Sequence, residues 1–165
     1  MGYTTEFNGR LSLSRQLSLD ETNFINKFSE TRRMKRDSEK LFVKYNGKYG
    51  RILNENEEKS PITCYGKDGE FFIGDDESTG VIDYNSHASQ PGLWCQWVIE
   101  ENTLCWDGNE KFYYYTEWLE YLIEYFFNPW GVILNGVIKW RGEDFSDLGI
   151  ITVDNNVVVS NNMEF

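Results

Sequence analysis

The chain has 165 residues, of which 40% are hydrophobic and 16% aromatic, and this content argues against disorder and allows one domain with its own core. It has three cysteines, no CxxC pair and one histidine, which argues against a disulfide framework or a zinc site. We therefore expect a single domain over residues 1–165 that binds no metal and no cofactor.

The N-terminus lacks the pattern of a secretory signal, and no run of about 18 apolar residues is present. We expect a soluble protein of the reducing cytoplasm with no membrane partner. The formal net charge is -11, but residues 1–60 carry 12 Lys and Arg against 9 Asp and Glu, whereas residues 61–165 carry 4 against 18. Three interpretations follow: a compact anion pocket in the basic part, an acidic surface for a basic partner or one that imitates nucleic acid, or a basic segment satisfied within the protein.

Residues 5–14 alternate in polarity and predict a strand, and Ser18 with Glu21 forms a capping box that begins a helix over about 19–33. This helix places Phe24, Ile25 and Phe28 on one face. The sequence TRRMKRD then puts four cations at the helix C-terminus, where they would complement the partial negative charge of the last carbonyls.

Residues 44–69 predict a long irregular connection with one short strand near 62–65, and short strands are expected at 70–74 and 81–85. In LWCQWVIEENTLCWDG, two strand-like runs flank Glu100–Thr103, and the symmetric register would pair Trp97 with Trp106 and Val98 with Cys105.

A second helix is predicted from an N-cap at Thr116 to just before Pro129. Its expected core stripe consists of Trp118, Leu119, Leu122, Ile123, Phe126 and Phe127. A neighbouring face combines acidic and aromatic residues, namely Glu117, Glu120, Tyr121, Glu124 and Tyr125.

Strands are expected again at 131–143, in LGIITV and in NNVVVS, with a turn at Asp154 and Asn155 and a frayed end at 161–165. The element order predicts an α+β domain, with an antiparallel sheet and two helices packed mainly on one face.

The sequence contains no nucleotide-binding glycine loop, and His87 in a polar loop is interpreted as an exposed loop histidine rather than a catalytic base. The cysteines are interpreted as small core residues. A metal-dependent hydrolase using Asp75, Asp76 and Asp83 is the weakest alternative, because the GDDESTG stretch lacks the ligand spacing of an EF-hand.

An anion site is the stronger alternative, since guanidinium groups bind phosphate and an aromatic ring can stack a base. Its candidate residues are Arg32, Arg33, Lys35, Arg36, Tyr84 and Trp94. Such a site would hold a small anionic ligand, a nucleotide or the end of a nucleic acid.

The stretches TRRMKRD, DYN, QPGLWCQW and EWLEYLIEYFFNPWGVILNGVIKWRGED resemble a family of small proteins encoded mainly in bacteriophage genomes, over about residues 2–160. The resemblance carries no catalytic assignment. It implies a protein acting in the cytoplasm of an infected bacterium.

The sequence therefore favours a noncatalytic accessory protein that binds a host macromolecule, expected to be a protein, through Glu117, Glu120, Tyr121, Glu124 and Tyr125. The alternative is nucleotide or nucleic-acid binding or processing at Arg32–Arg36.

Overall fold

The computed structural model describes residues 2–37, 40, 43–44, 80–87 and 90–163. The chain forms two compact units, one made of Met1–Leu17 and Gln96–Phe165 and the other of Ser18–Cys95. An antiparallel sheet combined with helices confirms the predicted α+β class. Residues 45–69 of the predicted connection and the predicted strands at 62–65 and 70–74 lie outside the described residues.

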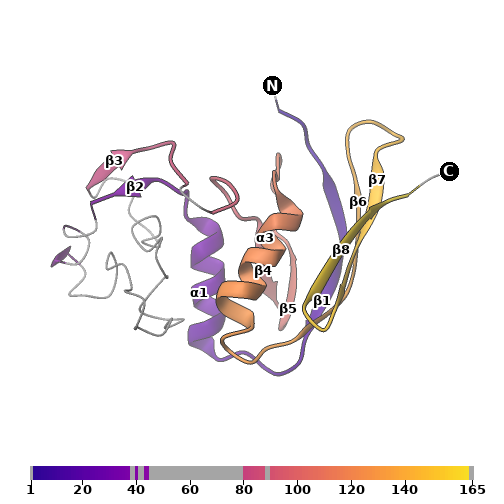
Figure 1. Ribbon diagram of the computed structural model, residues 1–165, viewed down its shortest axis with the longest axis horizontal. Helices are drawn as coiled ribbons and strands as arrows, with labels where there is room; N and C mark the ends of the chain where they lie inside the picture. Colours follow the sequence, from indigo (N-terminus) through magenta and orange to yellow (C-terminus); the bar gives the residue numbers. More distant parts are fainter. Residues whose placement is uncertain (1, 38–39, 41–42, 45–79, 88–89, 164–165) are drawn as a thin grey trace. The chain divides into compact units, whose positions relative to one another are not determined.

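The first unit is built on a six-stranded antiparallel sheet in the order β4-β5-β1-β6-β7-β8 (Figure 1). The last three strands form the predicted meander. The strands are β1 (Glu6–Leu13), β4 (Trp97–Glu100), β5 (Thr103–Trp106), β6 (Leu134–Arg141), β7 (Leu148–Asp154) and β8 (Val157–Asn162).

The hairpin of β4 and β5 has the predicted register, because Trp97 pairs with Trp106 and Val98 with Cys105. Its two-residue turn places Glu101 and Asn102 at positive φ, which matches the twist of the two strands. The β7–β8 turn likewise has positive φ at Asn155 and Asn156, one residue later than the turn predicted from the sequence.

One face of the sheet is covered by the second helix, α3 (Tyr115–Leu122), and by aromatic side chains. The Phe7 ring centroid lies 5.2 Å from that of Trp97, 5.7 Å from Phe112 and 4.9 Å from Tyr115. Tyr115 also lies 5.9 Å from Trp140 of β6. These contacts join α3 to β1, β4 and β6, so the aromatic cluster forms the centre of the core.

The predicted core stripe of the second helix is confirmed, since all six of its residues are buried. The helix begins earlier than predicted, with Tyr114 rather than Thr116 as N-cap, and Tyr114 has φ 58° and no side-chain cap. Tyr115 packs against Phe7, and this contact places Tyr115 in the first turn of α3. After Leu122 the backbone widens into a π-helix, η2 (Ile123–Phe127), which ends before Pro129 as expected.

The second unit begins with α1 (Leu19–Glu30), whose Ser18–Glu21 capping box and buried Phe24, Ile25 and Phe28 confirm the sequence analysis. The helix ends three residues before 33, because Thr31 is extended and the Arg33 N–H donates to the Leu93 carbonyl at 2.8 Å. A short sheet pairs β2 (Lys35–Arg36) with β3 (Val81–Asp83), the latter within the predicted 81–85 strand.

Candidate protein-binding surface

The carboxylates of α3 and η2 form an exposed row. Glu117, Glu120 and Glu124 are three and four residues apart, so they lie on one side of the helix, and all three are exposed. No ion pair or hydrogen bond of their side chains occurs within the described part of the chain. We refer to these three residues as the acidic row.

The two tyrosines predicted beside the acidic row are placed differently. Tyr121 is only 8% exposed, and its ring packs against Trp118, Phe126 and Tyr125, the last with centroids 4.5 Å apart. Tyr125 is half-buried. Tyr121 therefore belongs to the core, and it offers little surface to a partner.

Exposed aromatic side chains that the sequence analysis did not single out occur elsewhere in the same unit. Tyr113 and Tyr114 are 48% and 58% exposed just before α3, and Phe145 is 77% exposed in the loop between β6 and β7. Three consecutive tyrosines and a phenylalanine inside the acidic GEDFSD loop were the available signals. Large exposed rings next to charged residues are typical of protein-binding surfaces.

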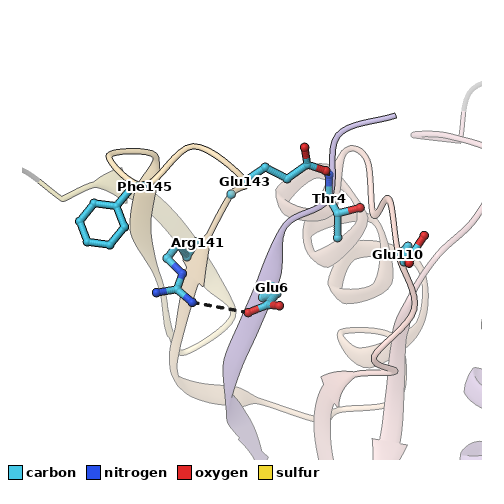
Figure 2. Close-up of a pocket in the computed structure, with 7 residues that line it drawn as sticks. Thr4, Glu6, Glu110, Arg141, Glu143 and Phe145 are labelled. Atoms are coloured by element: carbon cyan, nitrogen blue, oxygen red, sulfur yellow. Dashed lines mark hydrogen bonds and ion pairs between the residues drawn. The ribbon is translucent and has the colours of Figure 1, made fainter. Parts of the chain in front are cut away.

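The loop between β6 and β7 borders an open hollow of about 510 Å³ (Figure 2). In the hollow, Arg141 of β6 faces Glu6 of β1 at 3.8 Å, and both side chains are mostly exposed. The Thr4 N–H donates to Glu143 at 2.7 Å, so Glu143 extends over the N-terminal segment. The lining residues are Thr4, Glu6, Glu110, Arg141, Gly142, Glu143 and Phe145.

Hydrogen bonds hold this loop in a defined conformation. The Tyr3 hydroxyl donates to Asp147 at 2.6 Å, and the Asp144 N–H donates to the Tyr3 oxygen at 3.2 Å. The pKa of Tyr3 is raised chiefly by its bond to Asp147, and the pKa of Asp144 is lowered by the backbone and hydroxyl bonds of Ser146. The lowered pKa favours the ionised form of Asp144, and the bond from Tyr3 holds Asp147 in an ordered position.

The loop between β6 and β7, residues 142–147, is called the acidic loop. A carboxylate of this loop and one of the acidic row both influence the pKa of Tyr115. Burial raises the pKa of Tyr115, and the negative charges of Asp147 and Glu117 raise it further. Asp147 of the β6–β7 loop and Glu117 of α3 therefore both lie within electrostatic range of the Tyr115 hydroxyl. The first unit as a whole carries 5 Lys and Arg against 13 Asp and Glu.

In the predicted anion site in TRRMKRD, two arginines are buried instead of lining an open pocket. Arg33 and Arg36 are 0% and 1% exposed. The Arg33 guanidinium donates from Nε to Gln90 at 2.7 Å and from Nη1 to the carbonyls of Phe28 and Thr31, and it lies 3.7 Å from the centre of the Phe28 ring. Bonding to the last turn of α1 favours the interpretation that the Arg33 cation is satisfied within the protein.

Only part of the candidate anion set comes together. Arg32 stacks 3.8 Å from the Tyr84 ring centre and donates to the Tyr84 carbonyl and, at 3.0 Å, to Asn85. Lys35 is exposed, and Trp94 is 41% exposed. The accessible members are therefore Arg32, Lys35, Tyr84 and Trp94, without the two arginines that would supply half of the positive charge.

The described residues contain no group of three or more His, Cys, Asp or Glu that could hold a metal ion. Asp75 and Asp76 lie outside them, and Asp83 accepts a bond from the Asn85 N–H at 3.0 Å. His87 is half-buried rather than exposed as predicted, because its ring Nδ1 lies 2.7 Å from the Gln90 carbonyl.

No helix in the described part of the chain has the length and apolar character needed to cross a bilayer.

Cys95 and Cys105 are buried free thiols, as expected of small core residues, and Cys64 lies outside the described residues. Burial raises the pKa of Cys105 from 9.0 to about 11, with a further contribution from Glu100, to which its thiol donates at 3.5 Å.

We expect alkylation of Cys105 to follow this pKa. The protonated thiol is the stable folded form, so its contribution to stability is complete below pH 9.0 and is lost as the pH rises through about 11. The rate of iodoacetamide labelling at Cys105, mapped by peptide mass spectrometry, should therefore rise only toward the upper value. Glu100→Gln should lower that midpoint. A midpoint near 9 in the folded native chain would contradict the assignment.

No protein-family model, curated protein sequence or solved structure matches this chain. The function must therefore be argued from the chemistry of its own surface.

Proposed function

We propose that the chain is a noncatalytic binding protein that docks a basic surface of a partner protein through the acidic row of α3 and the neighbouring acidic loop. The observation that carries this proposal is the exposure of Glu117, Glu120 and Glu124 without a cationic partner in the described part of the chain. Carboxylates left unpaired on an ordered helix raise the negative potential and steer a basic surface into contact.

The distribution of cations in the first unit supports this interpretation. Arg10 pairs with Glu100 at 3.2 Å and Arg141 pairs with Glu6 at 3.8 Å, while Arg15 donates to the Trp130 carbonyl. Arg10 and Arg141 thus pair with carboxylates of the sheet, whereas no ion pair to the acidic row occurs among the described residues. The accessible rings of Tyr113, Tyr114 and Phe145 would supply apolar contact area to the partner.

The partner class follows from the charge. A nucleic acid would be repelled by the acidic first unit, so a protein with a Lys- and Arg-rich surface is the fitting ligand. In the bacteriophage setting that the sequence resemblance implies, this partner would be a host protein. The complex should weaken as salt screens the opposing charges.

A triple charge reversal tests the proposal. We expect Glu117→Lys, Glu120→Lys and Glu124→Lys together to abolish capture of the partner from a nuclease-treated bacterial lysate, because attraction becomes repulsion at the contact. The captured protein is identified by mass spectrometry with the unchanged chain, and its binding to each purified variant is then measured by calorimetry. The melting temperature should change little, since the three side chains are exposed.

The matched control carries the same change of charge elsewhere. Glu30→Lys, Glu101→Lys and Asp154→Lys alter three exposed acidic residues outside the acidic row, and binding should persist in this variant. Equal loss in both variants would show that only net charge matters. Unchanged binding in the first variant would remove the acidic row from the interface.

A further inference from the structure

The two edges of the six-stranded sheet differ in what they expose. In β4, at one edge, the side chains of Trp97 and Ile99 are 0% and 6% exposed and belong to the core. In β8, at the opposite edge, every residue from Val157 to Asn162 is exposed except the half-buried Val158 (Figure 1). An uncovered edge strand presents backbone groups to which another strand can bond.

The register identifies the backbone groups on that edge. The Met163 N–H donates to the Leu148 carbonyl at 2.8 Å, so alternation directs the N–H groups of residues 161, 159 and 157 toward β7. The N–H and C=O groups of Val158, Ser160 and Asn162 therefore point away from the sheet. No hydrogen bond to them occurs among the described residues.

The strand carries none of the features that keep sheet edges apart. Its sequence VVVSNN contains no charged residue and no proline, and its pairing with β7 runs without a bulge. Val157 and Val159 are 63% and 48% exposed on the face of the sheet opposite α3. Lysine, proline and bulges are the usual means of blocking such an edge.

Charge decides which occupant fits this edge. A net charge of -11 opposes association of two copies wherever their carboxylates would meet. This repulsion is smallest at β8, because the strand is exposed and its six residues carry no charge. Antiparallel pairing about a two-fold axis at Ser160 would place Val158 opposite Asn162 of the second copy, with no like charges opposed. The strand is therefore complementary to itself.

We propose that the chain forms a two-fold symmetric homodimer in which β8 pairs antiparallel with β8 of a second copy. About six backbone hydrogen bonds would join Val158, Ser160 and Asn162 of the two chains in a continuous sheet. The acidic row lies on α3 and η2 rather than on this edge, so dimerisation would present two acidic rows to one partner. Higher ionic strength should strengthen the dimer, because salt screens the repulsion between two acidic chains.

Light scattering coupled to size exclusion tests the proposal over roughly a hundredfold range of protein concentration. The expected mass of the full chain is twice the 19.4 kDa of the monomer at the upper end of the range. A mass of 19.4 kDa throughout would overturn the proposal. A mass that rises beyond the dimer, or a dimer that salt dissociates, would also overturn it.

Two substitutions and a control locate the interface. Ser160→Pro removes an N–H that points outward, so the β7 ladder is kept while the edge is blocked, and we expect loss of the dimer. Val159→Lys places two cations across the two-fold axis and should give the same result if the proline variant fails to fold. Thr152→Lys, directly opposite Val159 but one strand inside the edge, should remain dimeric. A dimer in Val159→Lys, or its loss in Thr152→Lys, would refute β8 pairing.

Discussion

Replacing Trp97 with alanine should lower the free energy of unfolding by about 3–5 kcal/mol, the range for removing a buried aromatic side chain. Trp97 is 0% exposed, and its ring meets those of Phe7 and Phe112 edge to face at 5.2 and 5.1 Å. The indole N–H also donates to the Tyr115 carbonyl at 2.9 Å. One substitution therefore opens a cavity and removes the bond that joins β4 to the start of α3.

Urea denaturation followed by far-UV circular dichroism measures this effect. Trp97→Phe should cost less than Trp97→Ala, because a ring is kept and chiefly the bond to Tyr115 is lost, worth about 1 kcal/mol. Trp94→Ala is the matched control, since its side chain is 41% exposed, and its effect should be clearly smaller than that of Trp97→Ala. Similar losses at Trp94 and Trp97 would mean that Trp97 is not at the centre of the core.

The core was predictable because its signals are local. The β4–β5 register follows from a two-residue turn between two apolar runs, and the buried stripe of α3 follows from helical spacing. The capping box at Ser18 and Glu21 likewise involves residues three apart. These features need no knowledge of which segments meet in space.

The predicted surface was less accurate because exposure depends on distant segments. Tyr121 lies on the same helix side as Glu117 and Glu124, yet the packing of Trp118 and Phe126 around its ring places it in the core. The exposure of Phe145 depends on hydrogen bonds between Tyr3 and the β6–β7 loop, which are over 140 residues apart in sequence. The open edge of β8 depends on the strand order, which hydrophobic periodicity does not specify.

The basic cluster shows the same limitation, and an alanine substitution at Arg33 tests its role directly. We expect Arg33→Ala to lower the free energy of unfolding by about 3 kcal/mol, because buried acceptors would lose a charged donor. These acceptors are the Gln90 side chain and the Phe28 and Thr31 carbonyls, and the guanidinium also covers the Phe28 ring. Arg33→Lys should recover only part of the loss, since an ammonium cannot reproduce the planar fork.

Lys35→Ala gives the matched control, because Lys35 is an exposed cation two residues away, and its effect should stay within about 0.5 kcal/mol. Chemical denaturation gives both values, and filter binding with a labelled RNA and with ATP gives the ligand test. If TRRMKRD were an anion site, Arg33→Ala would abolish binding and leave unfolding unchanged. A large loss of stability with no anion binding by the unchanged chain would instead fix Arg33 as the buried cation that joins the end of α1 to Gln90.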